Sequence, residues 1–88
     1  MPIGEKEVIA TYKDHKIRVT NGWFSGAKLY VDGECRDNSS AMIQTNKNSP
    51  MLSAKLSDNE IIEVYGIAIA AVKIKICVNG EQIGGDVF

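Results

Sequence analysis

The sequence predicts an all-β protein, an antiparallel β-sandwich of about seven to eight short strands joined by hairpins. Three observations predict this class. Ile and Val together number 18 and Leu only 3, and β-branched side chains favour strands over helices. Apolar and polar residues alternate with a period of two in several segments. Turn-forming pairs recur about every 8 to 12 residues, a spacing typical of sandwiches and barrels.

Length and composition indicate one ordinary globular domain. The chain has 88 residues, of which 44% are hydrophobic and 24% charged, with a formal net charge of −1. This length suits a single domain over residues 1–88. The composition excludes disorder driven by high charge, and the near-zero net charge gives no field that would attract a polyanion. We therefore expect no nucleic-acid partner.

The first part of the chain predicts three alternating strands, over residues 7–12, 16–20 and 27–31. A polar segment over residues 13–15 separates the first two. Asn21-Gly22 is expected to be a hairpin turn, because Asn and Gly both tolerate positive φ. Asp32-Gly33 has the same chemistry and is expected to close the next hairpin.

The rest of the chain predicts further strands with one ambiguous segment. Residues 41–45 fit either a short strand or one helical turn, and the polar stretches on both sides of them are typical of loops. Alternation returns over residues 51–57 and 60–65, with a turn at Asp58-Asn59. Gly66 is expected to interrupt the pattern.

The longest predicted strand covers residues 67–78, where even-numbered positions from 70 to 78 are all apolar. Asn79-Gly80 is expected to form a turn that leads into a last strand beginning at residue 81. No segment suits a crossover helix, which excludes a parallel sheet.

The inward positions of these strands define an expected core. They are apolar residues that alternate with polar ones: Ile17, Val19, Leu29, Val31, Leu52, Leu56, Ile62, Val64, Val72, Ile74, Ile76 and Val78. Burying such side chains offsets the entropy lost on folding and gives a domain of modest stability.

One short internal repeat is present. Residues 30–34 read Tyr-Val-Asp-Gly-Glu and residues 77–81 read Cys-Val-Asn-Gly-Glu. Two interpretations are open. The repeat reflects either the general preference of hairpins for Asp-Gly and Asn-Gly, or two similar hairpins in equivalent places of opposed sheets.

The sequence contains no arrangement typical of a catalytic centre. The single histidine, His15, lies in a polar turn, and Asp32, Asp37, Glu60 and Glu63 are expected to be solvated. No glycine pattern suits a phosphate, which requires a glycine-rich turn before a helix. We therefore expect no enzyme, no cofactor and no catalytic residue.

The two cysteines predict free thiols in a reducing compartment. Cys35 and Cys77 are 42 positions apart and form no CxxC pair, so with one His they make a poor zinc set. We expect no metal site. A small enzyme that uses Cys35 or Cys77 as a nucleophile is a third hypothesis for function, but neither thiol has an evident base.

Aromatic residues supply the candidate binding positions, Trp23, Phe24, Tyr30 and Tyr65. Adjacent aromatics in a strand point to opposite faces, so either Trp23 or Phe24 is expected outside, where a ring can stack on a sugar or anchor a partner. An apolar stripe on the opposite face of the later strands either caps an edge or serves self-association. It consists of Ile61, Tyr65, Ile69 and Ala71.

The apolar runs predict no membrane segment. The longest covers residues 66–72, and a spanning helix needs about 20 apolar residues. The N-terminus lacks the pattern of a signal peptide, so we expect a cytoplasmic protein.

Two segments resemble the β-sandwich domain of the Fas apoptotic inhibitory molecule family. The first contains the His-Lys-Ile start at residues 15–17, Ser25-Gly26 and the Tyr-Val-Asp-Gly hairpin at residues 30–33. The second is the Asn-Gly hairpin at residues 78–81. The resemblance covers residues 14–34 and 70–83, and residues 42–59 show no match. It implies a compact β-sandwich with a protein-interaction role and no catalytic centre, and it assigns no functional residue.

The sequence therefore predicts a non-catalytic binding or protein-interaction module, whose partner is another protein or a second copy of the chain. The alternative is a small-ligand or carbohydrate-binding module that uses the exposed aromatics.

Overall fold

The structure is a computed structural model, which describes residues 6–22, 26–39, 49–69 and 71–87, with the backbone alone for residues 68, 69, 71 and 72. This part of the chain forms eight strands and no helix, and all strand pairings are antiparallel. The prediction of an all-β antiparallel fold is confirmed for these residues. The strands are β1 (Lys6–Tyr12), β2 (His15–Gly22), β3 (Gly26–Val31), β4 (Glu34–Ser39), β5 (Leu52–Ser57), β6 (Glu60–Ile69), β7 (Ala71–Val78) and β8 (Glu81–Gly85).

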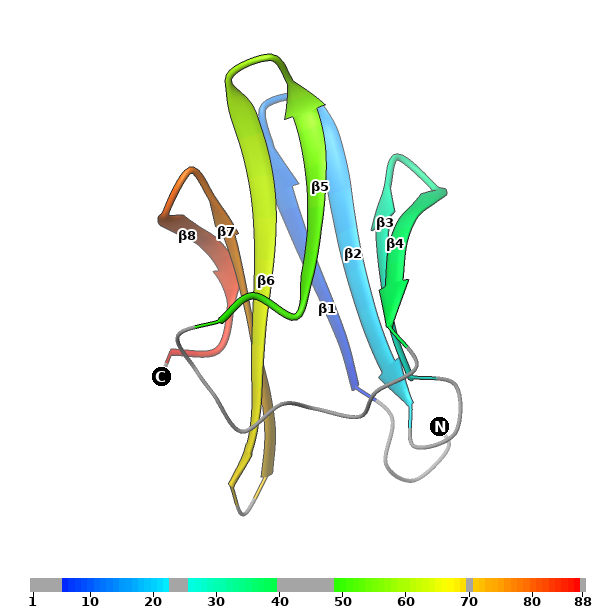
Figure 1. The fold of residues 1–88 in the computed structure, drawn as a ribbon, viewed down its shortest axis with the longest axis vertical. Helices are drawn as coiled ribbons and strands as arrows, with labels where there is room; N and C mark the ends of the chain where they lie inside the picture. Colours follow the sequence, from blue (N-terminus) through cyan, green and yellow to red (C-terminus); the bar gives the residue numbers. More distant parts are fainter. Residues whose placement is uncertain (1–5, 23–25, 40–48, 70, 88) are drawn as a thin grey trace.

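The strands form two four-stranded sheets in chain order. The first sheet has the order β1-β2-β3-β4 and the second β5-β6-β7-β8 (Figure 1). Each neighbouring pair is therefore a hairpin or a simple meander connection, as expected for strands joined by short polar turns. The sheets touch along two edges, where β1 lies against β8 and β4 lies against β5. We call these the β1–β8 seam and the β4–β5 seam.

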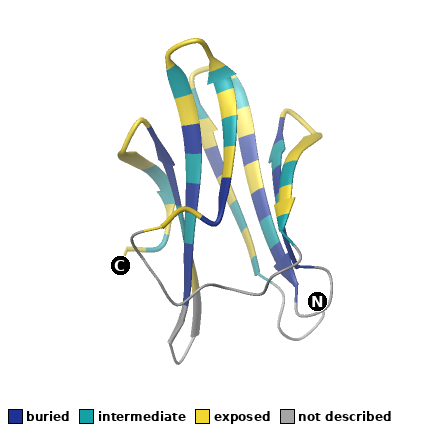
Figure 2. Ribbon diagram, viewed as in Figure 1, coloured by how far each residue is buried: buried dark blue, intermediate teal, exposed yellow. Residues whose placement is uncertain are grey.

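One apolar cluster contains side chains of both sheets. The predicted core residues are buried, with two exceptions. Leu56 is half-buried against the cluster, and the side chain of Val72 lies outside the described part. Figure 2 shows the alternation of buried and exposed residues along β2, which is the period of two that the sequence predicts. Three further residues join the core: Ala10, Ala27 and Met51.

Three predicted turns are confirmed, and two of them have positive φ at both central residues. Asp32 and Gly33 have φ of 53° and 84°, and Asn79 and Gly80 have φ of 50° and 84°. Positive φ at both central residues defines the hairpin turn that Asp-Gly and Asn-Gly favour. The turn expected at Asp58-Asn59 also lies between two strands, β5 and β6.

The turn predicted at Asn21-Gly22 is wrong. Both residues belong to β2, where Asn21 lies opposite Lys6 of β1 and Ala27 of β3. β2 is an inner strand, so Asn21 is paired on both sides, and Gly22 is paired with Gly26 of β3. This pairing holds the dipeptide extended and overrides its local turn preference. The side chain of Asn21 is 4% exposed.

The single long strand predicted over residues 67–78 is also wrong. The chain reverses within this range, so that β6 and β7 pair antiparallel with Ile62 opposite Val78 and Ile69 opposite Ala71. In this register each even-numbered residue of β6 lies opposite an even-numbered residue of β7. The apolar positions are therefore even-numbered both before and after the reversal, and the sequence shows one unbroken alternation. Gly66 does not interrupt β6, because it pairs with Ile74 inside the hairpin. Residues 41–45 lie outside the described part.

Candidate interaction surface

The outer face of the first sheet carries a row of three side chains across neighbouring strands. Ile9 of β1 lies opposite Arg18 of β2, which lies opposite Tyr30 of β3. Their neighbours in sequence are core residues, so these three point away from the core. Side chains directly opposite each other in antiparallel strands have Cβ atoms about 4.5–5.5 Å apart. We call Ile9, Arg18 and Tyr30 the outer row.

Arg18 is held in place from two sides. Its Nε donates a hydrogen bond to Glu7 Oε2 at 2.6 Å, and its guanidinium carbon lies 5.1 Å from the centre of the Tyr30 ring. The second contact is a cation–π interaction. These contacts fix a long side chain that would otherwise lose rotamer entropy on binding a partner.

Ile9 provides apolar area next to this stack. Its exposed fraction is 51%, which makes it one of three large hydrophobic side chains that the described residues expose, with Ile61 and Val87. Arg and Tyr are among the residues that dominate binding energy at protein interfaces, and an exposed aliphatic side chain beside them extends the contact area.

The same face has a positive charge. On β1–β3 the outward charged residues are Lys16, Arg18 and Lys28, against Glu7 alone, which gives a net charge of +2. The whole chain has a charge of −1. The face therefore favours a negatively charged partner surface at close range.

The structure separates the two described aromatic candidates. Tyr65 of β6 lies opposite Lys75 of β7 on the second sheet, and Lys75 Nζ is 5.3 Å from the centre of its ring. Burial raises the pKa of Tyr65 above its ordinary value. Tyr30 and Tyr65 thus point away from the core on different sheets and do not form one site. Trp23 and Phe24 lie outside the described residues, so their binding role stays a prediction.

The structure describes two side chains of the predicted apolar stripe, those of Ile61 and Tyr65. Ile61 is 48% exposed and Tyr65 is half-buried. The side chains of Ile69 and Ala71 lie outside the described part.

Glu60 is a polar centre that the sequence did not indicate, since we expected it to be solvated. Its side chain is only 17% exposed and accepts from three partners: Lys13 Nζ at 2.7 Å, Tyr12 Oη at 2.8 Å and Ser57 Oγ at 3.0 Å. The hydrogen bonds from Lys13, then Tyr12 and Ser57, lower the pKa of Glu60 to about 2. This cluster joins the β1–β2 turn to the β5–β6 turn. No sequence signal reveals it, because Tyr12 and Glu60 are 48 positions apart.

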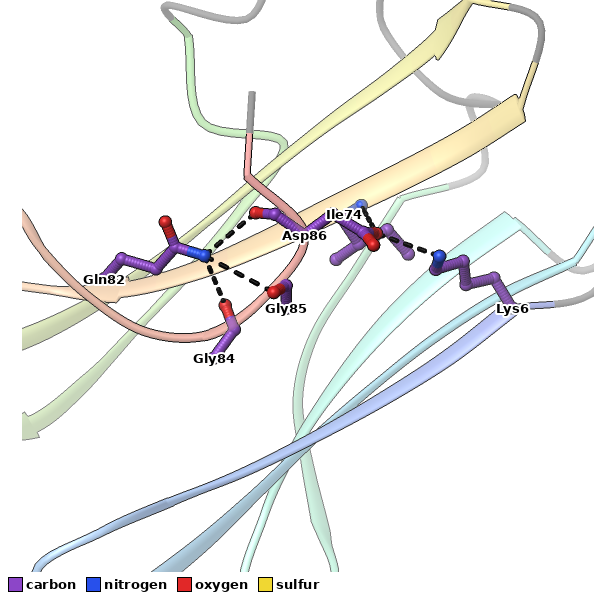
Figure 3. Close-up of polar contacts among 6 residues, drawn as sticks. All are labelled: Lys6, Ile74, Gln82, Gly84, Gly85 and Asp86. Carbon is purple, nitrogen blue, oxygen red and sulfur yellow. Dashed lines mark hydrogen bonds and ion pairs between the residues drawn. The ribbon is translucent and has the colours of Figure 1, made fainter.

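A second cluster closes the end of β8 (Figure 3). Asp86 Oδ2 accepts from Lys6 Nζ at 2.9 Å and from the Ile74 amide at 2.9 Å, while the Asp86 amide donates to the Ile74 carbonyl at 2.7 Å. Gln82 Nε2 donates to the Asp86 carbonyl at 2.9 Å. The ion pair with Lys6 lowers the pKa of Asp86. These contacts tie β8 to β7 and to β1, which is a structural role.

His15 and Asp32 form a hydrogen-bonded pair at the first sheet. His15 begins β2 and lies with Nδ1 at 2.7 Å from Asp32 Oδ2, so it is a partner of the β3–β4 turn rather than a solvated turn residue. This hydrogen bond, followed by the one from the Lys16 amide, lowers the pKa of Asp32.

Both cysteines are free, as predicted. Cys35 is exposed. Cys77 is buried, and burial raises the pKa of its thiol, which is the opposite of what activates a nucleophile. Within the ranges that the structure describes, no three or more His, Cys, Asp or Glu side chains group as metal ligands would.

Comparison of the chain with protein-family models, with curated proteins and with solved structures gives no match. A helix able to cross a bilayer is not found among the described residues. The resemblance to the Fas apoptotic inhibitory molecule family stays a prediction.

Proposed function

We propose that this protein is a non-catalytic protein-interaction module, whose two sheets stack as a sandwich and whose outer face of β1–β3 binds another protein. The observation that carries this proposal is the outer row, in which an exposed Ile9 lies beside an Arg18 that is stacked on Tyr30. The family resemblance implies the same class of function.

The chemistry of the face defines its partner. Three outward cations against one carboxylate favour a surface rich in Asp and Glu. Ile9 favours an apolar side chain at the centre of that surface, because removing both from water adds affinity. The partner is therefore a protein with an acidic patch around an exposed apolar residue.

A carbohydrate-binding function has weaker support. Sugar stacking uses the open faces of aromatic rings, and a cation covers one face of both Tyr30 and Tyr65. Quenching of Trp23 fluorescence by a panel of glycans tests this alternative, and quenching at micromolar concentration would favour it over the interaction module.

The matched pair Ile9 and Ile61 makes the test specific, because their exposed fractions are 51% and 48% but they lie on different sheets. Wild type, Ile9→Asp and Ile61→Asp are immobilised and exposed to lysate, and bound proteins are quantified by mass spectrometry. We select the protein that wild type and Ile61→Asp bind but Ile9→Asp does not. This partner is purified, and its affinity for each variant is measured by calorimetry.

We expect Ile9→Asp and Arg18→Ala each to weaken this binary complex at least about tenfold, the loss expected for an anchor residue at an interface. Ile61→Asp should leave affinity unchanged. Equal binding by the Ile9→Asp and Ile61→Asp variants, with both variants folded by circular dichroism, would overturn the proposal.

A further inference from the structure

The two sheets repeat one another. The strands between residues 6 and 39 form the first sheet and those between residues 52 and 85 the second, and each sheet is a four-stranded antiparallel meander. β1, β2, β3 and β4 thus correspond in order to β5, β6, β7 and β8. We call these segments the first half and the second half.

The correspondence extends to individual hydrogen bonds. The Asp32 amide donates to the Lys16 carbonyl at 2.8 Å, and Asp32 Oδ1 accepts from the Lys16 amide at 2.9 Å. In the second half the Asn79 amide donates to the Ile61 carbonyl at 3.1 Å, and Asn79 Oδ1 accepts from the Ile61 amide at 3.0 Å. Each turn is therefore anchored to the neighbouring strand by the same pair of bonds.

The irregularities of the sheets also coincide. The register of β3 against β4 shifts between Leu29 and Tyr30, and that of β7 against β8 shifts between Ile76 and Cys77. Both shifts fall where the short repeat of the sequence begins, at Tyr30 and at Cys77, which are 47 residues apart. The two copies of the short repeat therefore form hairpins at equivalent places in the two sheets, which is one of the two interpretations of the repeat given above.

The contacts between the halves have the same symmetry. β1 touches β8 and β7, while β5 touches β4 and β3. Exchanging the names of the halves converts the β1–β8 seam into the β4–β5 seam. The chain thus has the arrangement of a twofold-symmetric dimer whose two subunits are joined in one polypeptide.

Among the described residues, the contacts that join the two halves all involve side chains. All strand pairings lie within a half, and among the described residues the backbone bonds at turns and strand ends do as well. Between the halves the structure shows the shared core, the Lys6–Asp86 and Lys13–Glu60 ion pairs, the Tyr12–Glu60 hydrogen bond and the side-chain bonds of the β4–β5 seam. One chain segment, residues 40–50, connects the two halves.

We propose that two copies of this chain exchange halves, so that the first sheet of each copy packs on the second sheet of the other. The interaction surface is the inner face of each sheet, and its partner is a second copy. This face must be covered, because Ile17, Val19 and Leu29 are fully buried only through the shared core. A half from another chain offers the same face and re-forms every contact between the halves.

The protein concentration during refolding decides between the monomer and the dimer that exchanges halves. A short connection gives the halves of one chain an effective concentration of the order of millimolar. Refolding below this concentration favours the monomer, and refolding near it favours exchange. The outer row takes no part, so the proposal is independent of the function proposed above.

Three lysine–carboxylate pairs provide a direct test. Lys6–Asp86 at 2.9 Å and Lys13–Glu60 at 2.7 Å join the two halves, whereas Lys55–Asp58 at 3.7 Å lies within the second half. Equal amounts of ordinary and 15N-labelled chain are refolded together at about millimolar concentration. The dimer fraction is isolated, treated with a zero-length carbodiimide cross-linker and examined by mass spectrometry.

We expect the first two cross-links to join labelled with unlabelled peptides, while Lys55–Asp58 stays within one chain. Asp86→Asn should remove the Lys6 link and leave the Lys13–Glu60 link mixed. The dimer should persist on dilution and decay at the rate of unfolding. Absence of a dimer after such refolding, or a dimer in which all three links stay within single chains, would overturn the proposal.

Discussion

Gly84 of β8 packs directly against Ala10 of β1, so a methyl group added at this position tests the β1–β8 seam. A Cβ at Gly84 would lie 2.7 Å from the Ala10 Cβ. The φ of Gly84 is outside the left-handed region, so the backbone itself accepts alanine. The cost of Gly84→Ala is therefore a measure of how closely the two strands approach.

The magnitude follows from the overlap. Nonbonded carbon atoms lie about 3.5–4.0 Å apart, so β8 must withdraw from β1 by roughly 1 Å. Overpacking of this kind costs about 1–3 kcal/mol, and the stiffer unfolded chain offsets about 0.4–1 kcal/mol of it. We expect a net loss of about 1–2 kcal/mol, which lowers Tm by roughly 4–15 °C in a domain of this size.

A double-mutant cycle with Ala10→Gly isolates the contact. Ala10 is 6% exposed, so Ala10→Gly alone loses a buried methyl group and adds a flexible residue to a strand. In the double variant the methyl group moves from β1 to β8 and the overlap disappears. The free energy of unfolding, from urea titration followed by circular dichroism, should show a favourable coupling of about 1–3 kcal/mol.

Two outcomes would refute the reasoning. Additivity of the two single changes within about 0.5 kcal/mol is the behaviour of distant sites, and it would mean that β1 and β8 are not in contact. A Gly84→Ala variant more stable than wild type would mean that the seam has room for the methyl group.

Further predictions concern the other glycines, Glu60 and the thiols. Gly85→Ala should destabilise the protein more than Gly33→Ala. Both glycines have positive φ, 92° and 84°, but only at Gly85 would the added Cβ overlap a carbonyl oxygen of β7. Equal melting temperatures of the two variants would contradict this prediction. The pKa of Glu60 is lowered to about 2 from 4.5, so its contribution to stability is present above pH 4.5 and is lost as pH falls towards 2. Urea titrations should show that the free energy of unfolding falls more for wild type than for Glu60→Gln as pH drops from 4.5 towards 2. An equal fall in both proteins would argue against the hydrogen-bonded cluster around Glu60. Cys35 is exposed and should react with a thiol reagent in the folded protein, whereas the buried Cys77 should react only on unfolding. Labelling rates followed by mass spectrometry should show a fast phase that Cys35→Ser abolishes.

The strands were predictable where neighbouring residues carry the signal. Ile17 and Val19 alternate with polar residues, and they are buried as expected. Asp32-Gly33 and Asn79-Gly80 are turns because both residues of each pair tolerate the φ that a tight hairpin needs.

The same local signals misled where pairing with distant strands competes with them. Asn21-Gly22 has the composition of a turn but lies in β2, where Asn21 pairs with both neighbouring strands and Gly22 pairs with β3. The β6–β7 hairpin was missed because its register pairs even-numbered residues of β6 with even-numbered residues of β7. The same alternating pattern of apolar residues therefore fits a hairpin and a single long strand equally well.

For the candidate surface, the sequence indicated Tyr30 but not its neighbours. An outward tyrosine follows from the alternation of β3, whereas its contact with Arg18 and the adjacency of Ile9 depend on the registers of β1, β2 and β3. Trp23 and Phe24 remain candidates on sequence grounds.

The amino-acid sequence alone determined the class of the fold, most of its core and three of its turns, because period-two alternation and turn preference are properties of adjacent residues. The tertiary structure decided which strands meet at the seams, and it brought Glu60 to Tyr12 and Asp86 to Lys6 across 48 and 80 positions of sequence. Such pairs form when apolar side chains of both sheets are buried in one core, and no local preference of either residue encodes that arrangement.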